Sequence, residues 1–208
     1  MCNLTIYWEE GYLSFLTNKW YASLSSLHTS IMLRSTIQRS FFHTSASRFI
    51  KAGDRIPSVV VQRGSPADTV NVGELFGNAK KAILFGVPGA FTPGCSKTHL
   101  PGYINEAETL KSKHGVDLVA CVSVNDAFVM SAWGEASQSK DKVELLADSK
   151  GELAKAMELD FDATGALGGP RFQRFAAIVE NGTVKELFVE PTKTGLDVSL
   201  VENVKKHL

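Results

Sequence analysis

The sequence predicts an α/β fold in which a mixed central sheet is covered by helices. Strand-like and helix-like segments alternate between residues 82 and 159, which is typical of parallel strands joined by crossover helices. Asn181-Gly182 between two later apolar runs is a strong β-hairpin signal, and a hairpin adds antiparallel strands to the sheet. The 208 residues are 44% hydrophobic and 21% charged, an ordinary globular composition that fits one domain with an extension.

Continuous apolar runs mark the expected strands in the first half of the domain. A strand covered on both faces needs no polar side, so it reads as a short apolar or β-branched run. Such runs occupy residues 58–62, 82–87 and 117–124. Residues 72–76 predict a short helical turn. A helix is predicted after Cys95, with Pro101 as the place for a kink, because apolar residues recur there on one face. They are Leu100, Tyr103, Ile104, Ala107 and Leu110.

The second half continues the alternation and ends in the hairpin and a last helix. Strands are expected at residues 143–147, 175–180 and 184–189, and helices at residues 127–136, 151–159 and 200–207. Asp126 and Ser199 are expected to be the N-caps of the first and last of these helices. The order βαβαβα, then a hairpin, then a helix, is the arrangement of a thioredoxin-like domain.

Charge and cysteine content exclude several classes of protein. The 22 basic and 22 acidic residues cancel, so the chain lacks the net field on which many nucleic-acid binders rely. The three cysteines, Cys2, Cys95 and Cys121, are widely spaced and form no CxxC pair. This spacing argues against a disulfide scaffold and against a metal site. The apolar runs are shorter than the ~18 residues that a membrane span needs.

Residues 1–48 are predicted to be an extension that holds a mitochondrial transit peptide at about residues 32–48. That segment is rich in Arg, Ser and Thr and contains no acidic residue, as such peptides do. Its apolar helical stripe consists of Leu33, Ile37 and Phe41. Residues 1–31 contain two glutamates and are interpreted as an upstream extension or an alternative start. The folded domain is then expected at residues 49–208.

Cys95 has the strongest chemical context in the chain. A buried strand ends at Val87, a loop rich in Pro and Gly follows, and Cys95 stands where a helix begins. The free N–H groups and the positive end of the helix dipole stabilise a thiolate, the nucleophilic form of cysteine. Thr92 brings a hydroxyl close to the sulfur, and Pro88 can wall the pocket. The alternative is a buried, inert cysteine.

These residues resemble a known active-site signature. The spacing Pro88-x-x-x-Thr92-x-x-Cys95 is similar to that of the peroxiredoxins, and FGVPGAFTPGCSKTHLPGY resembles the peroxiredoxin-five or type II subfamily. The resemblance covers about residues 50–208. Further matching segments are VSVNDAFVMSAW (122–133), LLAD (145–148), RFAAIVENG (174–182) and VEPTKTGL (189–196).

The resemblance implies a thiol peroxidase with no metal or organic cofactor. Cys95 would attack the O–O bond of hydrogen peroxide or an alkyl hydroperoxide and become a sulfenic acid. Thr92 would position the peroxide, and the N–H groups of Gly94 and Cys95 would help to bind it. Arg174 matches the arginine that holds thiolate and peroxide in the family, in preference to Arg171. The alternative for Arg174 is an exposed cation on a strand.

The sequence departs from animal members of the subfamily at the resolving cysteine, because Val198 stands where they have it. Cys121 lies within an apolar strand and is interpreted as a core residue, with a resolving role as the alternative. One-cysteine chemistry is therefore expected, with glutathione and glutaredoxin, or thioredoxin, as the reductant.

Several further expectations follow from the resemblance and the targeting segment. They are a mitochondrial matrix location, with a cytoplasmic form from an alternative start, and a homodimer. A peroxide sensor that relays oxidation to a partner protein is the alternative function. His99 is expected to be a partly exposed helix residue, with tuning of the thiolate as the alternative. Trp133 and Phe128 are expected on one helix face, as core or dimer contacts.

Overall fold

The computed structural model describes residues 49–208, and the predictions for residues 1–48 lie outside this range. The strands of the main sheet are β1 Val60–Arg63, β2 Ser65–Asn71, β3 Lys81–Gly86, β4 Leu118–Ser123, β5 Glu144–Ala147, β8 Phe175–Glu180 and β9 Thr183–Val189. The helices are α1 Val72–Gly77, α2 Leu100–His114, α3 Ala127–Ser137, α4 Glu152–Ala156, α5 Thr164–Leu167 and α6 Val201–Val204. Shorter elements are the π-helical turn η1 Cys95–His99, the 3-10 turn η2 Lys205–His207, and the strands β6 Asp160–Asp162 and β7 Pro170–Phe172.

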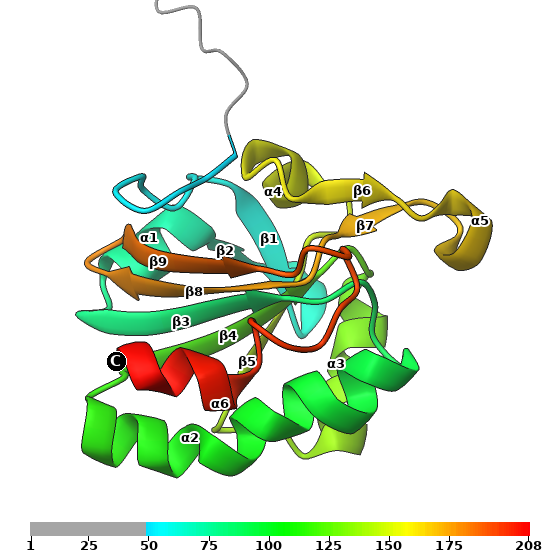
Figure 1. Ribbon diagram of the computed structural model, residues 1–208. Helices are drawn as coiled ribbons and strands as arrows, with labels where there is room; N and C mark the ends of the chain where they lie inside the picture. The colour runs from blue at the N-terminus through cyan, green and yellow to red at the C-terminus, as the bar shows by residue number, and fades with distance from the viewer. Residues whose placement is uncertain (1–48) are drawn as a thin grey trace, which may run out of the picture. The chain divides into compact units, whose positions relative to one another are not determined.

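The central sheet is mixed, as the sequence predicts. Its strand order is β2-β1-β5-β4-β3-β8-β9, with β3, β4 and β5 parallel and the outer strands antiparallel to their neighbours (Figure 1). Because β3 and β4 are parallel neighbours, their carboxyl ends meet at one edge of the sheet. Loops at such an edge are where α/β proteins bind ligands.

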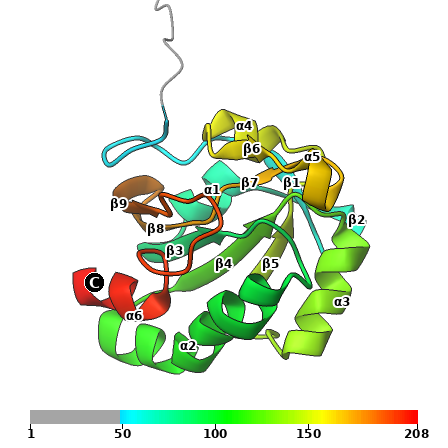
Figure 2. The same ribbon diagram turned by 45° about the vertical axis from the view of Figure 1, so that its right-hand side comes forward.

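Helices cover both faces of the sheet (Figures 1 and 2). The helices α2, α3 and α6 lie on one face, and α1 and α4 lie on the other. Side chains of β3 alternate between the two faces, since Ala82 and Leu84 join one core cluster and Ile83 and Phe85 join the other. The central strands β3 and β4 are thus buried on both faces, which explains their continuous apolar runs in the sequence.

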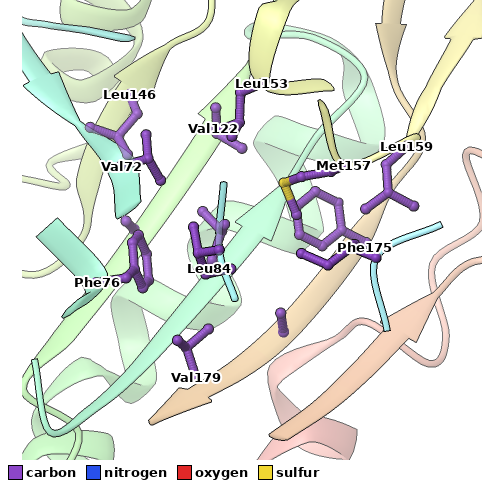
Figure 3. Packing of buried hydrophobic residues seen from close by; sticks show 14 of the residues in the cluster. Val72, Phe76, Leu84, Val122, Leu146, Leu153, Met157, Leu159, Phe175 and Val179 are labelled. Carbon is purple, nitrogen blue, oxygen red and sulfur yellow. The ribbon is translucent and has the colours of Figure 1, made fainter. Parts of the chain in front are cut away.

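The carboxyl end of β3 packs closely against the side chain of Phe175 on β8. Figure 3 shows Phe175 among Leu84, Met157 and Leu159 in the core cluster under α1 and α4. A Cβ at Gly86 would lie 2.1 Å from the Phe175 ring, so only glycine fits where β3 meets β8. The two strands are therefore held in register next to the Cys95 loop, with Gly86 opposite Phe175.

Two sequence predictions about the fold are wrong in detail. Ser199 does not cap the last helix, because α6 has Leu200 at the N-cap position and Ser199 is buried with its hydroxyl on Glu190. The helix predicted at residues 151–159 is shorter, because Glu158 has a positive φ of 54° and ends the helical path.

Candidate functional site

Cys95 lies in the first turn of a helix that starts at the carboxyl edge of β3. The helix begins at Pro93, and Ser96 N–H makes its first-turn hydrogen bond to the Thr92 carbonyl at 2.9 Å. Pro93 has no N–H, and the N–H groups of Gly94 and Cys95 precede that bond in the helix. These N–H groups point toward the N-terminal end of the helix, where they favour the binding of an anion. The Cys95 side chain is fully buried.

The helix that carries Cys95 is not regular. Residues 95–99 form a π-helical turn, in which Leu100 N–H donates to the Cys95 carbonyl five residues back. Pro101 lies in the first turn of α2, directly after the π-helical turn. Its backbone nitrogen has no hydrogen to donate to the preceding turn. The kink expected at Pro101 thus takes the form of a π turn, a feature often found at functional sites.

The loop before Cys95 is fixed by polar groups at the carboxyl end of β4. Asn125 Oδ1 accepts hydrogen bonds from Ala90 N–H at 3.0 Å and from the Ser123 hydroxyl at 2.8 Å. The Ser123 hydroxyl also lies 3.3 Å from the Val87 carbonyl. Sequence reasoning gave Ser123 and Asn125 no role, although polar residues at the carboxyl end of a buried strand were a usable signal.

Arg174 is brought to Cys95 by strand register. Because Phe175 pairs with Gly86, the preceding residue lies beside the end of β3, on the opposite face from Phe175. Its side chain is only 3% exposed, which excludes the exposed-cation alternative. Arg174 Nη1 donates to Cys95 Sγ at 3.3 Å, and its Nε donates to the Thr194 carbonyl at 3.3 Å.

Arg171, the alternative arginine, has a different environment. Arg171 donates to the carbonyls of Val124 and Leu167, at 2.8 and 2.7 Å. The structure therefore places Arg174, and not Arg171, on the sulfur of Cys95.

Pro88, Thr92 and Gly94 belong to the loop and first helical turn that lead to Cys95. The Thr92 hydroxyl donates to the Gly89 carbonyl at 2.9 Å, which leaves its lone pairs as acceptors. Pro88 is buried in the loop. A Cβ on Gly94 would lie 3.0 Å from Leu196 Cδ1 and 3.3 Å from Arg174 Nη2, so a side chain here would press on the arginine.

His99 is buried, contrary to the expectation of a partly exposed residue. Its side chain is 1% exposed and lies 3.2 Å from Arg174 Nη1 and 3.1 Å from the Ser199 carbonyl. Burial, and then the positive charge of Arg174, lower the pKa of His99 to about 3. The ring is therefore neutral at physiological pH.

Glu190 organises the segment between β9 and α6, which runs beside the start of the Cys95 helix (Figure 1). Its Oε1 accepts from Asp197 N–H, Ser199 N–H and the Ser199 hydroxyl at 2.7–2.9 Å. Burial alone would raise the pKa of Glu190, but the donors from Ser199 and Asp197, and then Arg174, together lower it below its usual value.

The free energy of unfolding is expected to depend on Glu190 and on pH. A carboxyl whose pKa is lower in the folded state contributes stability above its usual pKa of 4.5, and loses it as the pH falls through the folded value. Glu190→Gln should therefore destabilise the protein by on the order of 1 kcal/mol at pH 7, and by less in acid. Urea titrations of both proteins between pH 7 and pH 3 measure this difference. A gap that widened toward acid would contradict the assignment.

Cys121 lies on β4 with Phe85 of β3 on one side and Leu145 of β5 on the other. It is fully buried, and both Cys95 and Cys121 are free thiols. Burial, with a smaller contribution from Cys95, raises the pKa of Cys121 well above its usual value, although Arg174 opposes this. The thiol is therefore protonated and held in the sheet.

Among residues 49–208, no group of three or more His, Cys, Asp or Glu side chains is placed to hold a metal ion. In the same range, none of the helices has the length and apolar character that crossing a membrane requires.

Comparisons with known proteins show which family this chain resembles. Residues 51–205 match the Redoxin family. Peroxiredoxin-2E, chloroplastic, of Arabidopsis thaliana is 42% identical over 75% of this chain and 68% of its own length. Peroxiredoxin-2F, mitochondrial, of Oryza sativa subsp. japonica is 42% identical over 60% of this chain and 63% of its own length. The crystal structure of reduced Prx3 from Vibrio vulnificus in complex with H2O2 superposes with a TM-score of 0.71 and 46% identity, over 77% of this chain and all of that one.

Proposed function

The chain belongs to the peroxiredoxins of the Redoxin family and is a thiol peroxidase, and we propose that Cys95 is its nucleophile and Arg174 the cation that activates it. The contact between Arg174 Nη1 and the buried Cys95 Sγ, at the start of a helix, carries this proposal. A fixed guanidinium and a helix N-terminus both favour the thiolate, and the thiolate is the form that attacks peroxides.

The proposed reaction is a nucleophilic displacement at oxygen. The thiolate of Cys95 attacks the terminal oxygen of a hydroperoxide, an S–O bond forms, and the O–O bond breaks. The sulfur is oxidised to a sulfenic acid, and the departing oxygen leaves as an alkoxide or hydroxide that takes up a proton. Arg174 has donors that can follow the negative charge from sulfur to the departing oxygen, so it stabilises the transition state more than the ground state.

The neighbouring residues bind and orient the peroxide. Because the Thr92 hydroxyl donates its proton to Gly89, its oxygen is free to accept the peroxide O–H. The N–H groups of Gly94 and Cys95 provide donors at the helix end. Pro88 is buried in the preceding loop and offers no competing N–H.

Steady-state peroxide consumption tests the function and its reductant. The full chain is assayed with hydrogen peroxide and either thioredoxin with its reductase or glutathione with glutaredoxin. Sustained turnover with at least one of the two systems is expected, because the sulfenic acid needs an external thiol. A single round of oxidation that stalls with both would instead favour the relay alternative.

We further propose that Cys121 does not resolve the sulfenic acid. Oxidation with one equivalent of hydrogen peroxide should add one oxygen to Cys95 and form no Cys95–Cys121 disulfide, since the β4 backbone is paired on both sides. Cys121→Ser should keep the turnover of the wild type and lose about 1–3 kcal/mol of stability by burying a hydroxyl. Non-reducing intact mass and peptide mapping, which separates Cys2, measure the products.

A loss of two hydrogens in the wild type that disappears in Cys121→Ser would show that Cys121 resolves. Cys2→Ser is the matched control, because it removes a thiol outside the described residues and should leave the Cys95 product unchanged.

The proposed location is the mitochondrial matrix, and the proposed assembly is a homodimer. The acid-free segment 32–48 supports the location, and imaging the full chain with a carboxyl-terminal tag tests it. Phe91 and Phe128 support the dimer, since they are 54% and 67% exposed and follow β3 and β4 at the edge that holds Cys95. Sedimentation equilibrium measures the assembly.

A further inference from the structure

His99 lies between the guanidinium of Arg174 and the backbone carbonyl of Ser199. Its Nδ1 lies 3.2 Å from Arg174 Nη1, and its Nε2 lies 3.1 Å from the Ser199 carbonyl oxygen. Both contacts are buried and join residues that are 75 and 100 positions apart in the chain. His99 has no assigned role in the chemistry proposed above.

The chemistry of the two partners fixes the tautomer of the ring. A carbonyl oxygen can only accept, so the proton must be on Nε2 of His99. A guanidinium can only donate, so Nδ1 must be the unprotonated acceptor for Arg174. Both contacts are therefore satisfied by one neutral form of the ring, and protonation of Nδ1 would break the bond to Arg174.

The same nitrogen of Arg174 contacts both the histidine and the cysteine. Nη1 carries two hydrogens, and it donates to His99 Nδ1 at 3.2 Å and to Cys95 Sγ at 3.3 Å. With Nε on the Thr194 carbonyl, the planar guanidinium is held at three points. Nη2 then faces Gly94, the side from which peroxide is proposed to bind. Loss of the acceptor on His99 would free one of these points and let the guanidinium rotate.

The ring of His99 is itself held rigidly. It packs against the stacked rings of Phe85 and Tyr103, whose centroids lie 4.9 and 5.6 Å from the centroid of His99. The Tyr103 hydroxyl donates to the same Ser199 carbonyl at 2.9 Å. An acceptor that cannot move is what a positioning role requires.

We propose that His99 is a positioning residue of the peroxidase site, whose neutral ring holds Arg174 Nη1 against the sulfur of Cys95. The inference rests on the proposed function, because it assigns His99 a role in the step that Cys95 and Arg174 perform. His99 does not contact the peroxide. It acts through Arg174, in the way that an orienting group holds a catalytic one.

Two substitutions separate the two contacts of the ring. Asn places an amide oxygen near the position of Nδ1, so His99→Asn keeps an acceptor for Arg174 and loses the bond to Ser199. Gln reaches the position of Nε2, so His99→Gln keeps the bond to Ser199 and loses the acceptor for Arg174. Tyr103→Phe is the matched control for His99→Asn, because it removes the other donor to the Ser199 carbonyl and leaves Arg174 untouched.

The readout is the single-turnover rate at which the reduced full chain forms Cys95 sulfenic acid with hydrogen peroxide, measured by quenched flow and mass spectrometry. His99→Gln should lower this rate by roughly 10- to 100-fold, the scale of a small misplacement of a reacting group. His99→Asn and Tyr103→Phe should stay close to the wild type. Thermal unfolding of each variant shows whether it folds.

The outcomes distinguish this inference from the proposed function. If the wild type reacts and both histidine variants lose rate equally, or neither does, His99 is a structural residue only. If the wild type itself forms no sulfenic acid, the proposed function fails first.

A measurement on the wild type tests the role of His99 even if the variants do not fold. The ¹⁵N shifts of His99 should report a proton on Nε2 and none on Nδ1, unchanged between pH 5 and pH 8. A titration in that range, or a proton on Nδ1, would overturn the inference. The charged and titratable groups in contact with the ring are Arg174 and Tyr103, and Cys95 shares the Nη1 donor of Arg174 with it.

Discussion

Replacing Cys95 by serine is expected to abolish peroxide turnover while leaving the fold intact. A hydroxyl has nearly the volume of a thiol, so the buried site beside Arg174 should keep its packing. It does not ionise at neutral pH, so no anion is available to attack the O–O bond. Removal of an enzyme's nucleophile costs up to about 10⁶-fold in rate, and a loss of at least ~10³-fold is expected here. Peroxide consumption with each thiol system measures it.

The control for this experiment is Cys121→Ser, the same chemical change at the other buried cysteine. It should keep the wild-type rate because Cys121 is held inside the sheet as a protonated thiol. Thermal unfolding of Cys95→Ser shows whether its loss of rate reflects loss of structure. Residual turnover of Cys95→Ser above a few per cent of the wild type would place the nucleophile elsewhere in the chain.

Strands buried on both faces could be predicted from the sequence, and so could the edge strand β9 from its hairpin signal, but the edge strand β2 could not. The runs at 82–87 and 117–124 correspond to β3 and β4, because both faces of these strands pack against helices. The strand β2 was missed. Its sequence, SPADTVN, is largely exposed, contains Pro66 and has no apolar period. What makes it a strand is pairing with β1, which no local pattern encodes.

The turn proposed to bind peroxide could be predicted because its residues lie close together in the chain. Pro88, Thr92 and Cys95 are set by one loop and one helix start, so their spacing already carries the chemistry. Arg174 was identified only by resemblance, because its direction depends on the register of β8 against β3. Arg174 and Cys95 are 79 positions apart in the sequence, and the secondary-structure propensities of single residues carry no information about contacts over such a separation.

Burial of polar side chains was the part of the site that sequence reasoning could not reach. His99 was expected to be partly exposed, yet a buried histidine is stable here because both ring nitrogens have partners. Ser199 has the residue type of an N-cap, but the carboxylate of Glu190 accepts from its N–H and its hydroxyl. Phe128 and Trp133 were expected on one face, but they are five positions apart, and Phe128 is exposed while Trp133 is buried.

Arg174→Lys is expected to slow sulfenic acid formation by about 10²–10³-fold, the cost of removing one fixed donor to the developing charge in a transition state. Lysine keeps the charge but lacks the planar fork, so one nitrogen cannot contact Cys95, His99 and Thr194 together. The single-turnover rate with hydrogen peroxide, measured at several peroxide concentrations, is the test.

Arg171→Lys is the matched control for this change. Arg171 also donates to backbone carbonyls at the same end of the domain, but its partners are Val124 and Leu167 and not the sulfur of Cys95. It should therefore lose stability on the scale of one or two hydrogen bonds, about 1–2 kcal/mol, with little change in rate. Equal loss of rate in both variants would mean that any disturbance of this end of the sheet slows the reaction.

The stability of Arg174→Lys separates charge from geometry. If the lysine keeps the hydrogen bonds of Arg174, the free energy of unfolding should change little. If it leaves the Thr194 carbonyl or His99 Nδ1 unpaired, the variant should lose about 1–3 kcal/mol of stability for each unpaired acceptor. If the rate falls while the free energy of unfolding changes by less than this, the fork acts on the reacting atoms and not on the fold. A guanidinium held by His99 and Thr194 in the reduced protein needs no reorientation when the peroxide arrives, and this preorganisation is what lysine cannot reproduce.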